Sequence, residues 1–159
     1  MFMEGMFGLS HIESLIVYHI SSYEYRIGKV YNTKNNPRRE YQNSAKISIE
    51  QNAEKCRKEI DEYTLPSRYY CLYVCDEKHL HYWYNQLKNI RADINLKIYR
   101  VELCGTILWT YADWLLSNHF CNYWKAEAAN HMVQYEGLFC GEYKLLSEHT
   151  IDEFDNDRD

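Results

Sequence analysis

Residues 66–84, PSRYYCLYVCDEKHLHYWY, decide the fold because they predict a short strand that leads directly into a helix. We expect the strand at about 69–75 and the helix at about 77–90, and both segments carry aromatic side chains. A strand and the helix that follows it usually pack together, so rings from both can face one crevice. Two rings with a gap between them suit a flat heteroaromatic ligand, through stacking and exclusion of water. The alternative is that these rings belong to an ordinary hydrophobic core.

The length and composition predict one folded domain. The chain has 159 residues, 46% of them hydrophobic, which is enough to bury a core without metal ions or disulfides. We expect a single domain at residues 1–150 and a frayed acidic tail at 151–159. The formal net charge of −5 disfavours broad binding to nucleic acid. The basic segment 34–39, KNNPRR, is interpreted as a solvated loop, with a local nucleic-acid contact as the alternative.

The cysteines and the apolar residues predict where the protein acts. Six cysteines are spread along the chain without a CxxC pair, so we expect free thiols in a reducing compartment and no metal site. No run of about 18 apolar residues occurs, and a membrane span is therefore not expected. The opening residues, MFMEGMFGLSHIE, lack the basic and long apolar regions of a signal peptide. We expect a cytoplasmic protein, either in the cell that makes it or in a target host cell.

Short strands alternate with helices along the rest of the chain. The apolar run LIVYHI at 15–20, the alternating IYRVEL at 98–103 and residues 142–146 predict three further strands. A helix is expected from Ser48, where Gln51 completes a capping pattern, and its apolar stripe comprises Ile49, Ala53, Cys56 and Ile60. Residues 112–132 favour one aromatic-rich helix or two short ones. This order predicts a mixed domain, of the α/β or the α+β class.

A histidine and two glutamates are the residues most suited to chemistry. His19 ends the first predicted strand, where a neutral imidazole can donate one hydrogen bond and accept another, as a ribose hydroxyl requires. Glu136 and Glu142 lie near the start of the last predicted strand. A single carboxylate there can bind a ribose 2′-hydroxyl and stabilise positive charge at the anomeric carbon. The alternatives are a structural histidine and two surface glutamates.

Taken in order, these segments resemble the ADP-ribosyltransferase superfamily, in the histidine–tyrosine–glutamate branch of diphtheria-type toxins and poly(ADP-ribose) polymerases. YHIS at 18–21 resembles the Tyr-His-Gly-Ser/Thr of that branch, although Ile20 replaces the glycine. LYVCD at 72–76, with two aromatic residues beyond it, is similar to the Ile-Tyr-Phe-Ala segment and the later stacking tyrosine. EGLF at 136–139 resembles the Glu-x-Leu-Val of DNA- and antibiotic-modifying relatives, and GEYKL at 141–145 resembles the Asn-Glu-Tyr-Ile-Val of the polymerases. PSR at 66–68, with the helix before it, also resembles a small bacterial domain family of unknown function.

The resemblance implies an α+β fold and a set of roles for individual side chains. The fold is a split β-sandwich of two small sheets flanked by helices, with NAD bound between them as the substrate. His19 and Ser21 are expected to hold the adenosine-side ribose, while Tyr73 stacks on nicotinamide together with Trp83 or Tyr82. Glu136 or Glu142 is expected to support the loss of nicotinamide, and Glu136 ranks first because Gln134 precedes it by two residues. Arg68 is expected to pair with the pyrophosphate, because its planar guanidinium matches phosphate oxygens.

These implications predict a mono-ADP-ribosyltransferase that modifies a macromolecule, with a protein favoured as acceptor, in the manner of a bacterial or phage toxin or effector. An NAD hydrolase and an inactive relative with the same fold remain open, as does a fold relative that acts on nucleic acid. The alternative from another class is a non-enzymatic acidic interaction protein. Such an inhibitor or effector would bind a host protein through a tyrosine-rich surface.

Overall fold

Three long antiparallel strands form the centre of the structure. In the computed structural model, which describes residues 8–91, 95–129 and 131–154, these strands are β1 (Leu9–Ser21), β4 (Lys97–Tyr111) and β5 (Tyr135–His149). β4 pairs with β1 along one edge and with β5 along the other. The strands predicted at 15–20, 98–103 and 142–146 are confirmed in position, but all three are longer than predicted.

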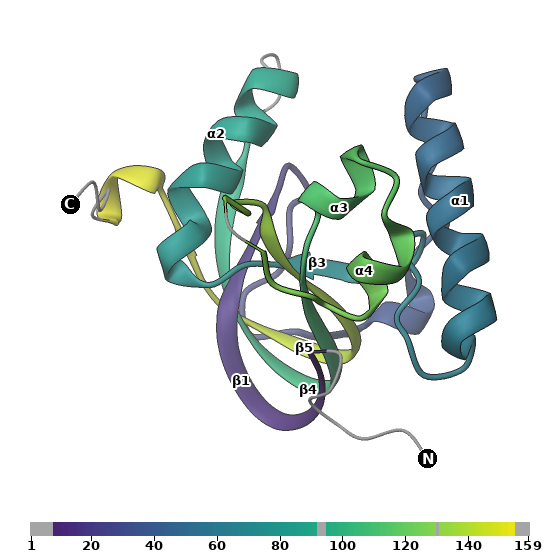
Figure 1. Ribbon diagram of the computed structural model, residues 1–159. Coiled ribbons are helices and arrows are strands. Elements are labelled where there is room, and N and C mark those ends of the chain that lie inside the picture. Colours follow the sequence, from purple (N-terminus) through teal and green to yellow (C-terminus); the bar gives the residue numbers. More distant parts are fainter. Residues whose placement is uncertain (1–7, 92–94, 130, 155–159) are drawn as a thin grey trace.

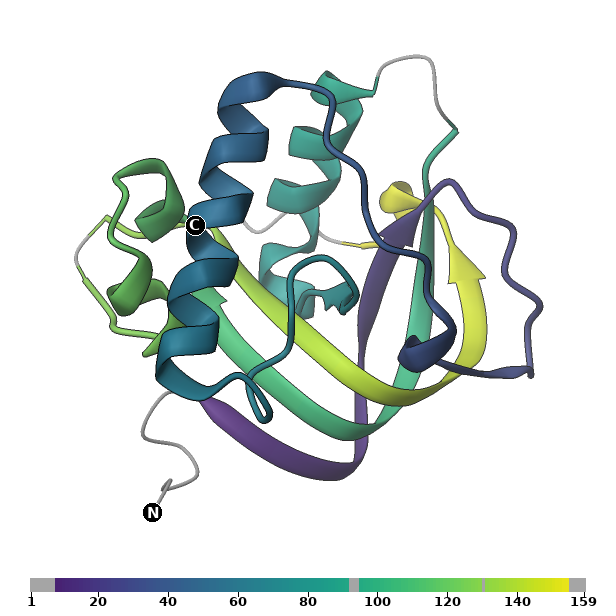
Figure 2. The same ribbon diagram turned by 90° about the vertical axis from the view of Figure 1, so that its right-hand side faces the viewer.

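Two glycines explain why β4 and β5 continue past their predicted limits. Gly105 and Gly141 pair with each other midway along the two strands, with φ values of +154° and +144° that disfavour other residues. A Cβ on Gly105 would lie 2.3 Å from the carbonyl oxygen of Cys140. The predicted strands stop short of these two glycines, which in the structure let two bending strands approach closely (Figure 2).

The remaining strands both pair with the other edge of β5. β2 (Val30–Asn32) pairs with residues 142–144, and β3 (Leu72–Val74) pairs with residues 137–139. β3 also reaches β1, because Tyr18 and Cys75 exchange two backbone hydrogen bonds of 3.0 and 2.9 Å. The described strands therefore form one five-stranded antiparallel sheet that curves back on itself (Figures 1 and 2), and not two separate sheets as we expected.

The stretch at 66–84 forms a shorter strand than predicted. Residues 68–70 form a turn, closed by a hydrogen bond of 2.9 Å from the Cys71 N–H to the Ser67 carbonyl, so β3 begins only at Leu72. The helix predicted at 77–90 is confirmed as the 3-10 turn η2 (Glu77–His79) followed by α2 (Leu80–Ile90). The strand and the helix are thus connected by Asp76, whose side chain accepts a hydrogen bond from the His79 N–H.

Among the described residues three hydrophobic clusters support the sheet, and the two larger ones contain most of the core. The first is built from β1, β3, β4 and β5 and comprises Val17, Leu72, Val74, Tyr99, Val101, Leu103, Ile107, Phe139, Tyr143 and Leu145. The second joins the sheet to α1 (Ser44–Asp61), α3 (Asp113–Leu116) and α4 (Phe120–Trp124), and it includes Leu9, Ala53, Leu108, Leu115, Tyr123, Trp124 and Leu138. The two short helices within 112–132 are therefore confirmed.

Helix α1 lies along one side of the molecule (right in Figure 1). Its N-cap is Asn43, whose side chain accepts hydrogen bonds from two backbone N–H groups, so the predicted start at Ser48 is four residues too late. The predicted apolar stripe is confirmed, since Ala53 is buried and its three companions pack against the second cluster. The indole of Trp124 donates a hydrogen bond of 2.8 Å to the Ala53 carbonyl and holds α4 against α1.

The first part of the acidic tail is folded. Thr150 and Glu153 form a capping box around η3 (Ile151–Glu153), and the Phe154 ring lies edge-on to Tyr18 of β1 at 5.2 Å. We expected fraying from residue 151, which is wrong for 151–154, and residues 155–159 lie outside the described part. Within the described ranges, no helix combines the length and apolar composition needed to cross a membrane.

Candidate functional site

A buried arginine holds together three elements of the fold. The Arg68 guanidinium, on the loop before β3, donates to both carboxylate oxygens of Glu50 on α1 at 2.8 and 3.0 Å. Its Nη1 donates to Glu136 Oε2 of β5 at 2.7 Å and to the Tyr123 hydroxyl of α4 at 2.6 Å. We call Glu50, Arg68, Tyr123 and Glu136 the Arg68 cluster. All four are buried, so the cluster satisfies charges that would otherwise be costly in the interior.

One oxygen of the Glu136 carboxylate is fixed by two hydrogen bonds, and the other accepts none from the described residues. Oε2 accepts hydrogen bonds from Arg68 and, at 2.6 Å, from the Tyr123 hydroxyl. Burial raises the pKa of Tyr123 well above its usual value despite the nearby Arg68, so the hydroxyl remains a donor at neutral pH. Oε1 accepts no hydrogen bond from the part of the chain that the structure describes, and the Glu136 side chain retains 9% exposure. This oxygen can therefore accept a hydrogen bond from a ligand hydroxyl.

Glu50 pairs with Arg68 through both of its carboxylate oxygens, whereas Glu136 uses only one. The Glu50 side chain is fully buried and also lies 3.1 Å from the Lys46 ammonium one helical turn away. Burial alone would raise the pKa of Glu50, but the Arg68 and Lys46 cations outweigh it and hold this pKa below its usual value. Glu50 therefore keeps its charge at neutral pH and anchors Arg68 to α1.

Tyr73 of β3 lies beside the Arg68 cluster. Its ring centroid is 5.1 Å from the Arg68 guanidinium and 4.4 Å from that of Arg39, and its hydroxyl donates to the Arg68 carbonyl at 3.2 Å. Arg39 also donates to the Arg68 carbonyl, at 2.8 Å, and is only half-buried. Within the described ranges, no carboxylate pairs with Arg39. A partly exposed cation without an anionic partner is suited to a phosphate ligand.

His19 of β1 is adjacent to Tyr73. Its Nδ1 lies 2.7 Å from the Tyr73 carbonyl oxygen, which makes Nδ1 the donor and leaves Nε2 as an acceptor, 3.5 Å from the Tyr25 hydroxyl. Burial lowers the pKa of His19 to about 4, and the nearby Arg39 acts in the same direction. The imidazole is therefore neutral at pH 7, with one nitrogen able to accept a hydrogen bond from a hydroxyl.

Trp83 of α2 connects the helix to the start of β5. Its indole N–H donates to the Tyr135 carbonyl at 2.6 Å, one residue before Glu136. Trp83 and Tyr73 both pack against the second hydrophobic cluster, and no direct contact joins their rings among the described residues. Tyr82 meets Trp83 edge-on at 5.2 Å, and nothing in the described structure joins it to Tyr73 or His19.

The structure thus brings five predicted site residues into one neighbourhood and leaves three outside it. His19, Tyr73, Arg68 and Glu136 are connected as described above. Trp83 joins this neighbourhood through Tyr135, the residue before Glu136. Glu142 is exposed and pairs with Asn32 and Cys104, six residues along β5 from Glu136 and therefore about 20 Å away along the strand. Ser21 accepts a hydrogen bond from the Tyr23 N–H and stabilises the turn after β1. Arg68 is buried, and its contacts to two carboxylates do not suit the pyrophosphate role that we expected.

The sequence did not identify Glu50, Tyr123, Arg39 or Tyr25. Glu50 lies beside the predicted apolar stripe of α1, and a charge there looks like part of the solvated face. Arg39 belongs to the KNNPRR segment that we interpreted as a solvated loop. The roles of these residues depend on contacts between segments that are far apart in the sequence. The spacing of residues along the chain does not indicate such contacts.

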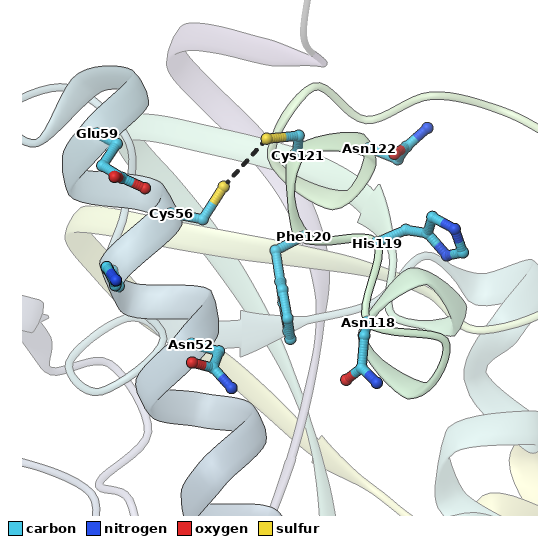
Figure 3. Close-up of a pocket in the computed structure, with 9 residues that line it drawn as sticks. Asn52, Cys56, Glu59, Asn118, His119, Phe120, Cys121 and Asn122 are labelled. Atoms are coloured by element: carbon cyan, nitrogen blue, oxygen red, sulfur yellow. Dashed lines mark hydrogen bonds between the residues drawn. The ribbon is translucent and has the colours of Figure 1, made fainter.

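The described surface also has pockets away from these residues. One, of about 440 Å³, lies between α1 and the α3–α4 region and contains a pair of cysteines (Figure 3). Another, of about 310 Å³, is formed by polar residues of α1 together with Arg38 and Tyr69. Neither is lined by His19, Tyr73 or Glu136. In the described ranges, no three His, Cys, Asp or Glu residues are grouped so that they could hold a metal ion.

Comparison with curated proteins finds no match to the chain. Comparison with protein families finds one matching family model. The matched residues extend from within β1 to the end of η3 and include every residue of the Arg68 cluster. The model of the family described as "Protein of unknown function (DUF2441)" matches residues 16–153 of the 159 residues, and the chain therefore belongs to this family.

Proposed function

We propose that the chain is a mono-ADP-ribosyltransferase that uses NAD as its substrate, and that its curved sheet is a continuous form of the split β-sandwich. The observation that carries this proposal is the unbroken series of contacts from His19 through Tyr73 and Arg68 to Glu136. These residues come from three parts of the chain that are far apart in the sequence: β1, the segment 68–73 and β5. Three of them are the histidine, tyrosine and glutamate of the resemblance.

His19 would bind a ribose hydroxyl. Because Nδ1–H is committed to the Tyr73 carbonyl, the histidine ring is held in one orientation with Nε2 as the acceptor. The contact of Nε2 with the Tyr25 hydroxyl is long, at 3.5 Å, and is therefore a weak hydrogen bond. Replacing it by a hydrogen bond from a ribose hydroxyl would cost little energy. The neutral state of His19 at pH 7 suits this task.

Tyr73 would stack on the nicotinamide ring. The Tyr73 ring already attracts two guanidinium groups, and the pyridinium of NAD is also a cation, so it can take the place of Arg39 over this ring. Arg39, once displaced, has no carboxylate partner in the described structure and can pair with the pyrophosphate. Arg39 thus takes the role that the sequence suggested for Arg68. Trp83, fixed to the Tyr135 carbonyl, would form the opposite wall.

Glu136 would stabilise the positive charge that develops at the anomeric carbon as nicotinamide leaves. Arg68 and Tyr123 hold Oε2 in place, so Oε1 can accept a hydrogen bond from the ribose 2′-hydroxyl without rotation of the carboxylate. Glu142 is too far along β5 to share this task. Because Arg39 lies over the Tyr73 ring, NAD binding requires this side chain to move.

The competing proposal of a tyrosine-rich recognition surface has less support. Such a surface requires many exposed tyrosines, and only Tyr23, Tyr63 and Tyr70 are exposed. These three lie on separate loops and on the turn before β3. The other tyrosines are buried or half-buried in the packing described above.

Release of nicotinamide from NAD tests the proposed function. The purified chain is incubated with NAD, alone and with lysate proteins as acceptors, and nicotinamide is measured by chromatography. We expect Glu136→Gln to lower the rate by about 100-fold or more, the usual loss for one electrostatic contact to a transition state. Glu142→Gln, the same substitution on the same strand, is the matched control and keeps the wild-type rate.

Thermal unfolding of each variant separates lost chemistry from lost folding. Equal rates in wild-type protein and a folded Glu136→Gln variant contradict the assignment of Glu136. No release by the wild-type chain, with or without lysate, contradicts the transferase proposal itself.

A further inference from the structure

Two cysteines from distant parts of the chain face each other in the pocket between α1 and α4. The Sγ atoms of Cys56 on α1 and Cys121 on α4 lie 3.3 Å apart, and Figure 3 shows the two thiols pointing toward one another across the gap between the helices. Cys56 is half-buried and Cys121 is exposed. The remaining cysteines form no such pair: Cys71 and Cys75 are buried, Cys104 is exposed on β4 and Cys140 is half-buried.

The pocket gives small molecules access to this pair. Its volume of about 440 Å³ is bordered by polar side chains, among them Asn52, Lys55, His119 and Asn122. The volume is within the range of small-ligand sites, and the cysteines line it directly. A reagent the size of a tripeptide can therefore reach the exposed Cys121 without unfolding the protein.

The distance between the sulfurs favours a disulfide over other uses of the pair. A disulfide bond is about 2.05 Å long, so the sulfurs need to approach each other by about 1.3 Å. The pair lacks a third ligand for a metal ion, since no group of three His, Cys, Asp or Glu in the described ranges is arranged to hold one. The two helices already pack together through the second hydrophobic cluster, and this packing holds the two thiols side by side.

We propose that Cys56 and Cys121 are a redox-active dithiol, which a small-molecule disulfide such as oxidised glutathione converts into a disulfide joining α1 to α4. In the first step the Cys121 thiolate attacks one sulfur of the reagent, its S–S bond breaks and one glutathione thiol leaves. In the second step Cys56 loses its proton and attacks Cys121 Sγ, and the second glutathione thiol leaves. Over both steps the protein loses two protons and two electrons, and the reagent takes up both to become two glutathione thiols.

The order of the two steps follows from the environment of each thiol. Cys121 is exposed and Cys56 is half-buried, so a reagent meets Cys121 first. Burial, followed by the neighbouring Cys121, also raises the pKa of Cys56, which makes Cys56 the poorer first nucleophile. Cys56 reacts in the second step because it is held beside the mixed disulfide on Cys121. Its high effective concentration there compensates for its low nucleophilicity. The new bond would tie together the two helices that carry Glu50 and Tyr123, the partners of Arg68 on α1 and α4.

Counting and locating free thiols tests the proposal. The reduced chain is incubated in glutathione buffers of graded oxidation, alkylated after denaturation and mapped by mass spectrometry. We expect the Cys56 and Cys121 thiols to disappear together, with a linked peptide pair that contains both residues and no glutathione retained on either of them. The exposed Cys104 is the internal control for reagent activity, and Cys104→Ser should form the same link.

Replacing the second nucleophile tests the order of steps. Cys56→Ser should stop at the mixed disulfide and retain one glutathione on Cys121. The proposal is overturned if wild-type Cys121 keeps its glutathione, or if Cys121 stays reduced under conditions that modify Cys104. Both overturning results are read from the wild-type protein, so they do not depend on the folding of any variant.

Discussion

Replacing Arg68 by methionine should cost the protein a large part of its stability. The Arg68→Met variant leaves Glu50 and Glu136 as buried carboxylates without their shared cation, and only Glu50 retains a lysine nearby. Removing one partner of a buried ion pair typically costs about 3–5 kcal/mol. Since domains of this size are stable by about 5–15 kcal/mol, we expect the variant to be folded but marginal at pH 7.

The pH dependence of this loss identifies its cause. In the wild-type protein the pKa of Glu50 is held below its usual value, so the contribution of the ion pair is complete above the unfolded pKa of about 4.3 and disappears as the pH falls through the folded value. In Arg68→Met the buried carboxylates favour protonation, which removes their unpaired charge. The difference between the two proteins should therefore shrink as the pH falls from 7 to about 4.

Urea unfolding followed by tryptophan fluorescence measures both effects, with linear extrapolation to water at each pH. Arg38→Met is the matched control, because Arg38 is exposed and its contact with Glu40 at 3.4 Å is a surface pair worth at most about 1 kcal/mol. A loss below about 1 kcal/mol for Arg68→Met, or an equal loss at both pH values, would refute the reasoning.

Three further predictions concern the fold around the site. Gly141→Ala should destabilise the sheet by about 2–4 kcal/mol in urea unfolding, since its φ is +144° and a Cβ would lie 2.4 Å from the Cys104 carbonyl. Asn43→Ala should cost about 1 kcal/mol in the same assay, through loss of the α1 N-cap. His19 has a lowered folded pKa, so stability should fall by about 3 kcal/mol between pH 6.5 and pH 4 as the unfolded chain takes up its proton first. His19→Gln should flatten this part of the stability–pH curve, and an unchanged slope would exclude a buried neutral histidine.

The elements with strong local signals could be predicted from the sequence. The apolar stripe of α1, the helix at 77–90 and the cores of three strands were identified because their periodicity is local. The lengths of β4 and β5 were not, because a glycine that ends a strand and a glycine that allows a close crossing look alike in sequence. Only the pairing of Gly105 with Gly141 distinguishes the two cases.

The candidate site was predictable only in part for a similar reason. His19, Tyr73 and Glu136 were predicted as site residues from the short motifs around them. In the structure His19 contacts Tyr73, and Arg68 connects Tyr73 to Glu136. Glu50 and Tyr123 became visible only when α1 and α4 packed against the sheet and placed them on one guanidinium. The buried state of Arg68 was equally hidden, because a sequence does not reveal how many carboxylates surround an arginine.

Calorimetric titration with NAD tests the central claim most directly. The wild-type chain should bind NAD at one site with a Kd between about 1 μM and 1 mM, the usual range for an enzyme and its substrate. Arg39→Ala should weaken binding by about tenfold or more through loss of one charge-assisted phosphate contact, whereas Arg38→Ala, its exposed neighbour, should not. Absence of binding at millimolar NAD, or equal binding by all three proteins, would contradict an NAD site at His19, Tyr73 and Glu136.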